Sequence, residues 1–314
     1  MEKFKLLNGV EMPKVGLGTY LIDNKILPVT LMDAYELGYR KFDTAWRYKN
    51  EKVITKTFFK DNGLKREDIF ITTKVNSSGM FLFGWHGYSD WVHRTANIRY
   101  RTVKQAIEVS FKNLGLDYID LFLVHAVCPW YLEMYEVLTR MYHQGRIRAI
   151  GVSSFLPPHI ESLKEVSDVV PMVNQFEISP LNTQKDLIKY CQDKGIVPEA
   201  MSTLSHYHSN EVRKEIIENE IIINIAEKMD KSPAQIVWRW LYQQGVSLIP
   251  KTWNREHLKE NISIFDFELS TENMKAIDRL DKGEFLNYNI YSKLQYLPEK
   301  YKGWKDFKNK NSGK

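Results

Sequence analysis

Short apolar runs recur at eight places along this 314-residue chain, and segments with helical spacing separate them. The runs are KVGLGTY, KFDTAW, IFITTKV, YIDLFLVH, IRAIGVSSF, PMVNQF, GIVPEAMS and VSLIPK. Runs of this length are typical of buried strands, and a regular alternation of strand and helix favours a parallel sheet. This alternation limits the possible folds more than any other feature of the sequence.

Two of the intervening segments indicate helices directly. Ser232 and Pro233 precede AQIVWRWLYQQG as an N-cap residue followed by a proline at the first helical position. Residues 100–114 place four apolar side chains on one stripe of a helix: Val103, Ile107, Phe111 and Leu114. Strands and helices are therefore expected to alternate through the chain.

Eight strands with intervening helices predict an α/β fold of the (β/α)8 TIM barrel type, which forms one domain at ~250 residues and more. We expect a single domain over residues 1–314, with residues 281–314 as a C-terminal tail that lies partly over the barrel mouth or is frayed. The leading segment FKLLNGVEMP predicts a β-hairpin that closes the barrel floor, with Asn8 and Gly9 in its turn. A doubly wound open sheet is the alternative, but residues 16–19 are too short for its glycine-rich phosphate turn.

Charge and apolar content exclude several kinds of partner. The formal net charge is +5, and most of it is local, because residues 297–314 contain six lysines and only two acidic residues. A general affinity for nucleic acid is therefore not indicated. The N-terminus lacks an apolar signal core, and no run approaches the ~20 apolar residues of a membrane span, so we expect a cytoplasmic protein with no membrane partner. Cys128 and Cys191 are expected to be free thiols.

Three ionisable residues follow short stretches of strand-like sequence within these runs. Asp43 follows Lys41-Phe42, Lys74 ends the run FITTK, and His125 follows LFLV. Ionisable groups are costly at the ends of buried strands, and in a barrel the loops at the carboxyl ends of the strands carry the chemistry. Together with Tyr48, these residues form a candidate catalytic tetrad at the barrel mouth.

A tyrosine beside a lysine and an aspartate can act as a general acid. A free phenol has a pKa of ~10, and a nearby ammonium is expected to lower that pKa. Asp43 would hold Lys74 charged, Tyr48 would protonate a carbonyl oxygen, and His125 would polarise and orient that oxygen. None of these side chains can supply a hydride, so a reduction would need a cofactor.

Other chemistries fit these residues less well. A metal hydrolase would use His125 and Asp43 with further ligands, but the remaining histidines show no matched spacing apart from His206-x-His208 in a loop. We therefore predict no metal. A hydrolase or aldolase that forms a Schiff base on Lys74 is disfavoured, because Asp43 holds the lysine charged. Each tetrad residue alone would more often be structural, and it is the group of four that favours catalysis.

Five segments resemble motifs of the aldo-keto reductase family, in the family's order. They are GYRKFDTAWRYKNE, NLGLDYIDLFLVH, RIRAIGVSSF, VNQFEISP and IPKTWNREHLKENISIFDFELS. The resemblance implies a monomeric barrel that binds NADPH or NADH across its mouth, and a dimer is the alternative. It also implies that the protein reduces the carbonyl of a small-molecule aldehyde or ketone to an alcohol. The residues that match the family's tetrad are Asp43, Tyr48, Lys74 and His125.

The same resemblance implies which residues bind the cofactor. Ser153, Ser154 and Gln175 stand where the family holds the nicotinamide carboxamide. The residues that stand where it grips the adenosine and its 2′-phosphate are Lys251, Thr252, His257, Glu260 and Asn261. The other cofactor positions that it implies are Gly18, Thr19, Met201, Ser202 and Leu204.

Three of these positions depart from the family's pattern. Ser154 replaces an asparagine, Met201 replaces the tyrosine that stacks on the nicotinamide, and His257 replaces an arginine that commonly meets the 2′-phosphate. A thioether can still pack against a ring, and Lys251 still favours a phosphorylated cofactor by its charge, so we expect NADPH over NADH. The alternative function is a cofactor-binding regulatory protein with slow or no turnover, and the intact tetrad speaks against it.

The loop expected after the third strand, residues 76–100, is longer than in the family and rich in aromatic side chains. Large apolar groups in such a loop either bury against the barrel rim or line a ligand site. We expect Trp85 and Trp91 to form the wall of the substrate pocket together with Tyr20 and Trp46. The alternative is that the aromatic residues only anchor the loop.

Overall fold

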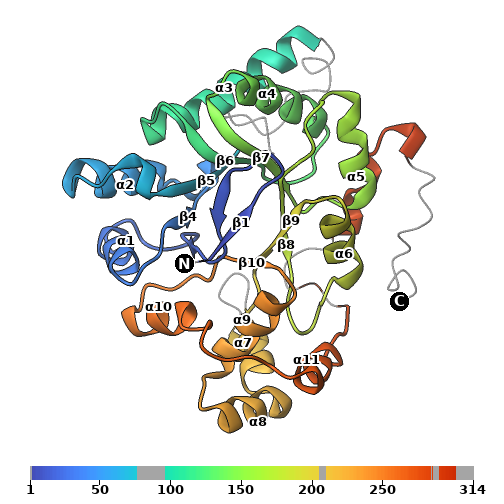
Figure 1. Ribbon diagram of the computed structural model, residues 1–314. Coiled ribbons are helices and arrows are strands. Elements are labelled where there is room, and N and C mark those ends of the chain that lie inside the picture. The colour runs from blue at the N-terminus through green and yellow to red at the C-terminus, as the bar shows by residue number, and fades with distance from the viewer. Residues whose placement is uncertain (1, 76–95, 205–209, 284, 286–289, 302–314) are drawn as a thin grey trace.

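Eight parallel strands form one sheet in chain order, with helices around it (Figure 1). The computed structural model describes residues 2–75, 96–204, 210–283, 285 and 290–301. The strands fall on the eight apolar runs, and their bounds are β3 (Leu17–Gly18), β4 (Lys41–Asp43), β5 (Phe70–Val75), β6 (Ile119–Val124), β7 (Ile147–Ser153), β8 (Val173–Glu177), β9 (Val197–Met201) and β10 (Ser247–Leu248).

The sheet closes on itself between its first and last strands. Val15, just before β3, pairs in parallel with Leu248 of β10. The Gly16 amide donates to the carbonyl oxygen of Leu248, and the Leu248 amide donates to that of Lys14, both at 2.8 Å. Closure leaves no open edge, so the predicted barrel is confirmed and the open-sheet alternative is excluded.

The helices surround the barrel on its outer face (Figure 1). Their bounds are α1 (Leu27–Glu36), α2 (Glu51–Thr55), α3 (Ala96–Leu114), α4 (Tyr131–His143), α5 (Pro157–Ser162), α6 (Lys185–Asp193), α7 (Asn210–Ile217), α8 (Glu220–Met229), α9 (Pro233–Gln243), α10 (Arg255–Ile262) and α11 (Thr271–Asp278). The π-helical segment is η2 (Lys56–Asp61), and the 3-10 segments are η1 (Trp46–Tyr48), η3 (Arg66–Asp68), η6 (Leu163–Glu165), η7 (Ile290–Tyr296) and η8 (Glu299–Tyr301). No helix in the described part of the chain is both long and apolar enough to cross a membrane.

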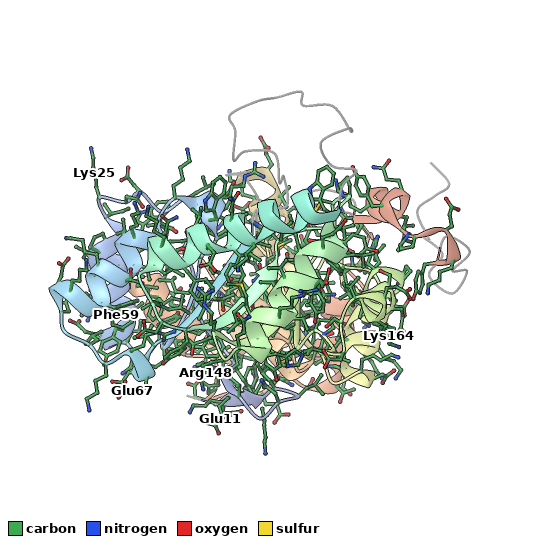
Figure 2. All side chains as sticks on the ribbon, turned by 90° about the horizontal axis from the view of Figure 1, so that it is seen from above. Glu11, Lys25, Phe59, Glu67, Arg148 and Lys164 are labelled. Carbon is green, nitrogen blue, oxygen red and sulfur yellow. The ribbon has the colours of Figure 1, made fainter. Side chains whose placement is uncertain are left out.

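The N-terminal hairpin pairs β1 (Lys3–Lys5) with β2 (Glu11–Pro13), as predicted. Gly9 lies in its turn with a φ of +86°, which glycine adopts without steric cost. Leu6 and Met12 pack against residues of several barrel strands, and the Asn8 side chain donates to the carbonyl oxygen of Arg148 at 2.8 Å. Glu11 and Arg148 lie at the same end of the molecule in Figure 2, so the hairpin closes the barrel floor.

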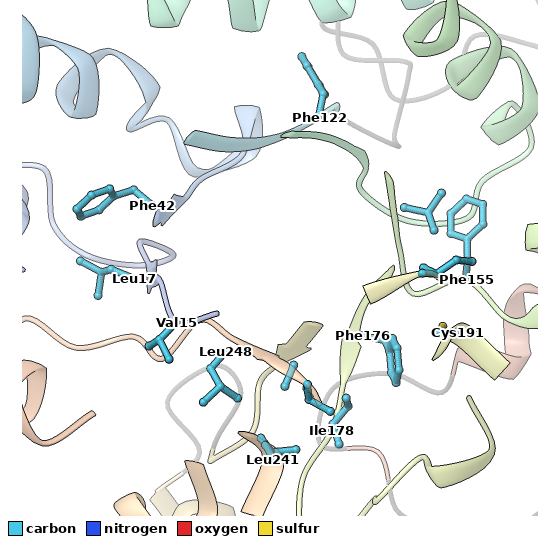
Figure 3. Packing of buried hydrophobic residues seen from close by; sticks show 14 of the residues in the cluster. Val15, Leu17, Phe42, Phe122, Phe155, Phe176, Ile178, Cys191, Leu241 and Leu248 are labelled. Carbon is cyan, nitrogen blue, oxygen red and sulfur yellow. The ribbon is translucent and has the colours of Figure 1, made fainter. Parts of the chain in front are cut away.

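Alternation along the strands places one set of side chains outward under the helices and the other set in the barrel interior, which is apolar at the floor and polar toward the mouth. Phe42, Phe122 and Phe176 belong to the buried apolar cluster of the outer layer (Figure 3). Lys41 and Asp43, on either side of Phe42, share the opposite face of β4 and are also buried. The site is therefore built from side chains that point into the barrel.

The described part of the C-terminal tail lies against α5 and η6. The carbonyl oxygen of Lys293 is 3.2 Å from His159 Nε2, and the Tyr301 hydroxyl donates to the carbonyl oxygen of Glu161. The position of the tail relative to the mouth, and the division of the chain into one domain and a tail, stay predictions.

The predicted start of α9 gives a test of local stability. Ser232 Oγ accepts from the Gln235 amide at 3.3 Å, and Gln235 Oε1 accepts from the Ser232 amide at 3.0 Å, which forms a capping box. We expect Ser232→Ala to lower the free energy of unfolding by about 1 kcal/mol, measured by urea denaturation. Ser232→Asp keeps an acceptor at the N-cap and is the control. Equal losses in the two variants would contradict a capping role.

Candidate active site

Lys74 links Asp43 and Tyr48 of the predicted tetrad through hydrogen bonds at the carboxyl end of the barrel. Its ammonium nitrogen lies 2.6 Å from Asp43 Oδ1, 3.4 Å from the Tyr48 hydroxyl and 3.0 Å from the carbonyl oxygen of Thr44. Three acceptors match the three N–H groups of an ammonium. The lysine and the aspartate are both buried, so each supplies the counter-charge that the other needs.

The backbone brings these residues together from three separate segments. Asp43 ends β4 and pairs in register with Thr72 of β5, so Lys74, two residues further on, lies on the same face. Tyr48 is the last residue of η1, which ends at Lys49 in a left-handed conformation. Asn50 stabilises this turn, because its side-chain NH2 donates to the carbonyl and hydroxyl oxygens of Thr19 and its side-chain oxygen accepts from the Thr44 hydroxyl.

His125 directly follows β6 and faces Tyr48 edge-on. The two ring centroids are 5.9 Å apart at an interplanar angle of 76°. Burial, with the positive charges of Lys74 and Arg47, lowers the pKa of His125 to about 3. The imidazole is therefore neutral at physiological pH and can donate one hydrogen bond without carrying charge.

Burial raises the pKa of Tyr48 above that of a free phenol, although the Lys74 ammonium opposes this shift. The effect of Lys74 on the pKa of Tyr48 has the expected sign, but the expectation left out desolvation, which is larger and sets the net direction. Burial alone would lower the pKa of Lys74, yet Asp43 and Tyr48 hold it above its ordinary value. Tyr48 thus keeps its proton, and Lys74 keeps its charge.

The three residues expected at the carboxamide position come together at the ends of β7 and β8. Ser153 pairs in register with Gln175, and the Ser154 amide donates to the Gln175 carbonyl oxygen at 2.8 Å. Both serine hydroxyl oxygens are buried without a hydrogen-bond partner among the residues that the structure describes. Buried hydroxyls of this kind call for a polar ligand. The carboxamide of a nicotinamide has the donors and the acceptor to fill that role, so these residues fit the cofactor.

Gly18 and Thr19 lie at the barrel wall beside Asp43. A Cβ on Gly18 would come within 2.8 Å of the carbonyl oxygen of Ile249, so only glycine fits where these strands approach. The Thr19 hydroxyl donates to the carbonyl oxygen of Asp43 at 2.8 Å. These contacts secure the strand that presents the aspartate.

Met201, Ser202 and Leu204 follow one another at the end of β9, where all three are partly exposed. Ser202 has a φ of +55°, which is uncommon for a residue with a side chain. His206, Tyr207 and His208 lie outside the described residues.

The residues expected at the adenosine end lie after β10 and on α10. Lys251 is exposed with its ammonium 5.1 Å from the Trp253 ring centroid, and Thr252 is partly buried. His257 is exposed and Glu260 partly so. Asn261 instead is buried.

The Asn261 oxygen accepts from the indole of Trp238 at 2.7 Å, a bond that joins α10 to α9. Arg255, near His257 in sequence, is bonded to Asp33 and Glu36 of α1. Arg255 is therefore held by two carboxylates of α1.

Two of the four expected substrate residues can be placed. Tyr20 lies against Tyr48 with ring centroids 4.7 Å apart, and Trp46 is the first residue of η1. Tyr20 and Trp46 are both partly exposed. Trp85 and Trp91 lie outside the described residues. The substrate-binding role of Tyr20 and Trp46 stays a prediction.

Sequence reasoning missed a second buried ion pair under the tetrad. Lys41 Nζ lies 2.5 Å from Glu199 Oε2, and both side chains are fully buried. Their signal in the sequence was a charged residue inside each of two apolar runs, the same signal that identified Asp43. In the described part of the chain, no group of His, Cys, Asp or Glu could hold a metal ion, and both cysteines are buried free thiols.

Comparison with known proteins agrees with this geometry. Residues 14–282 match the model of the aldo/keto reductase family. Glyoxal reductase from Bacillus subtilis (strain 168) is 40% identical over 291 residues, covering 91% of this chain and 95% of that protein. Methylglyoxal reductase DkgA from Yersinia pestis is 35% identical over 285 residues, covering 90% and 94%.

Solved structures give the same result. An aldo-keto reductase enzyme from a Medee basin deep-sea metagenome library is 35% identical, with a TM-score of 0.80 and coverage of 91% of this chain and 98% of that chain. A Bombyx mori aldo-keto reductase in complex with NADP is 29% identical, with a TM-score of 0.78 and coverage of 91% and 94%.

The low pKa of His125 predicts how stability responds to acid. Between pH 6.5 and about 3 the unfolded chain binds a proton at this residue and the folded protein does not. The stability of the fold therefore falls as the pH drops through this window. We expect the free energy of unfolding to decrease less between pH 7 and pH 4 in His125→Asn than in the parent, measured by urea denaturation at each pH. His159, whose pKa burial lowers to about 4, is present in both proteins and cancels. Parallel pH curves would contradict the assignment.

Proposed function

This chain belongs to the aldo/keto reductase family and is an NAD(P)H-dependent enzyme, and from that premise we propose that it reduces small dicarbonyls such as methylglyoxal and glyoxal with NADPH. The observation that carries the proposal is the Lys74 ammonium shared between Asp43 and the Tyr48 hydroxyl at 2.6 and 3.4 Å. The names of two relatives, a glyoxal reductase and a methylglyoxal reductase, support the substrate class. We also propose that the protein acts as a monomer in the cytoplasm.

In the proposed reaction, Tyr48 is the proton donor. NADPH, when bound, supplies a hydride for the carbonyl carbon. Tyr48 gives its proton to the carbonyl oxygen, so that one hydride and one proton convert the carbonyl to an alcohol. The raised pKa of Tyr48 keeps the phenol protonated until it is needed. As the proton leaves, the Lys74 ammonium stabilises the charge that develops on the phenol oxygen.

Asp43 and His125 prepare the site for this transfer. Asp43 keeps Lys74 charged, which a buried lysine without a carboxylate would not be. His125 is neutral, so its ring N–H can donate to the carbonyl oxygen and orient it beside Tyr48 without adding charge.

Several residues would hold the cofactor in the proposed complex. Ser153, Ser154 and Gln175 would bind the carboxamide, and Met201 would pack against the nicotinamide ring in place of a tyrosine. Lys251 would meet the 2′-phosphate as a point charge, which favours NADPH. We assign Gly18, Thr19 and Asn261 a supporting role, because each is used by the fold. The remaining cofactor positions in this proposal are Ser202, Leu204, Thr252, His257 and Glu260.

Tyr48→Phe tests the proton donor. The variant keeps the ring that packs against Tyr20 and removes only the hydroxyl. We expect turnover of methylglyoxal to fall by ~10²–10⁴-fold, the usual contribution of general acid catalysis, while the Kd for NADPH stays nearly unchanged. Steady-state kinetics and a fluorescence titration with NADPH measure the two effects. Tyr118→Phe, on a tyrosine beside Arg66, is the control. Activity within about tenfold of the parent would reject Tyr48 as the donor.

A panel of carbonyls tests the substrate class and the choice of cofactor. With NADPH we expect kcat/KM to be higher for methylglyoxal and glyoxal than for large aromatic aldehydes, followed by the loss of cofactor absorbance. NADH should support a lower kcat/KM, because it lacks the phosphate that Lys251 would meet. Equal efficiency with the two cofactors would overturn the preference. NADPH binding without turnover of any carbonyl would instead favour a regulatory protein.

A further inference from the structure

The second buried ion pair is connected to the tetrad by a continuous chain of hydrogen bonds. Gln175 Nε2 donates to Asp43 Oδ2 at 3.0 Å and to Glu199 Oε1 at 2.9 Å. Glu199 Oε2 in turn accepts from Lys41 at 2.5 Å and from the Ser247 hydroxyl at 2.8 Å. These bonds join β4 to β8 and β9, and neither of these two strands is a neighbour of β4 in the sheet, so the hydrogen-bond chain crosses the barrel interior.

The contacts fix the orientation of the Gln175 amide. Two ionised carboxylates can only accept hydrogen bonds, so the NH2 group of Gln175 must face them and its oxygen must face away. Both N–H groups are then used, one by each carboxylate. Asp43 and Glu199 are therefore held about 6 Å apart or less, since each lies within 3.0 Å of the same nitrogen.

The charged groups along this chain of hydrogen bonds have a definite order. Lys41 and Ser247 bond one oxygen of Glu199, and Gln175 bonds the other, so the negative end of this ion pair faces Asp43. Burial opposes the ionisation of Glu199, but Lys41, Gln175 and Ser247 outweigh it and lower the pKa of its carboxyl. At Asp43, burial raises the pKa and the charge of Glu199 raises it further, while Lys74 opposes both.

The groups that face Tyr48 determine how strongly the Glu199 charge affects the ionisation of the phenol. They come from β5, from β4, from the segment after β6, from the segment after β3 and from η1 itself: Lys74, Asp43, His125, Tyr20 and Arg47. Lys74 favours the phenolate, and Asp43 disfavours it. A fixed negative charge behind Asp43 strengthens the negative side of this balance.

We propose that Lys41 and Glu199 form a positioning unit for the tetrad, in which the Glu199 carboxylate, tied to Asp43 through the Gln175 amide, sets the pH at which Tyr48 gives up its proton. The unit contacts neither substrate nor tetrad hydroxyl and acts through Gln175 and Asp43. The inference rests on the proposed role of Tyr48 as the acid. Its consequence is that the pair keeps the reductase active at higher pH than the tetrad alone would.

Glu199→Gln and Lys41→Met/Glu199→Gln test the unit. Both remove the fixed carboxylate charge, so the phenolate becomes less unfavourable. For Glu199→Gln we expect the alkaline limb of kcat, measured with NADPH and methylglyoxal, to move to lower pH by about one unit. For the double variant we expect a smaller shift in the same direction, because that variant also removes the positive charge of Lys41. The single variant leaves Lys41 buried without its counter-charge and can fail to fold. The double variant removes both charges and keeps the test valid in that case.

Asp120→Asn is the matched control. Asp120 is a buried carboxylate near the start of β6, held by Arg66 at 2.6 Å and Arg148 at 2.7 Å at the floor end of the same barrel. Its loss should lower the thermal midpoint without moving the alkaline limb. A shift in the Glu199 variants no larger than in Asp120→Asn, together with an unchanged ionisation of Tyr48, would show that the Lys41–Glu199 pair is only structural, and would overturn the proposal.

A second measurement does not depend on turnover. The near-ultraviolet absorbance of phenolate is titrated in the parent and in Tyr48→Phe, and again with Glu199→Gln present in both, so that each difference isolates Tyr48. We expect the difference titration to show that Tyr48 ionises at lower pH in the Glu199→Gln background than in the parent background. A shift of this titration without any effect on catalysis would support the positioning unit and reject Tyr48 as the acid. Identical titrations would overturn the positioning unit even in an active reductase.

Discussion

The burial of the Lys74 ammonium is the constraint on which the site depends. A buried lysine keeps its charge only where a carboxylate and further acceptors surround it, and Asp43, Thr44 and Tyr48 provide them. The same contacts that make the lysine tolerable also place a cation beside the Tyr48 hydroxyl. Structural necessity and proposed catalysis therefore use the same three hydrogen bonds.

A polar layer inside the barrel, above an apolar floor, follows from this requirement. Two lysines and two carboxylates lie inside the sheet, and each ion has a partner of opposite charge within 2.6 Å. Gln175 joins the two pairs, so a change at Glu199 on β9 is transmitted to Asp43 on β4. The larger apolar cluster lies in the outer layer, where Phe42, Phe122 and Phe176 pack under the helices, and a smaller one fills the barrel floor.

The fold could be predicted almost completely from the sequence, because apolar runs and helix start signals are properties of the local sequence. The eight apolar runs gave the strands, and Ser232-Pro233 gave the start of α9. The tetrad could be predicted for the same reason: Asp43, Lys74 and His125 each end a run. Lys41 and Glu199 gave the same kind of signal, but inside a run a charged residue has no evident partner until the barrel closes and brings β4 and β9 to opposite sides of one interior.

The sequence by itself determined the order of strands and helices and the set of ionisable residues at the barrel mouth. The tertiary structure alone decided the sign of the net pKa shift at Tyr48, since desolvation depends on every atom around the phenol and not on its charged neighbour alone. It also decided which residues share the interior. Hydrogen bonds between strands that are far apart in sequence, such as those of Gln175 with Asp43 and Glu199, exist only because closure of the sheet fixes the distance across it.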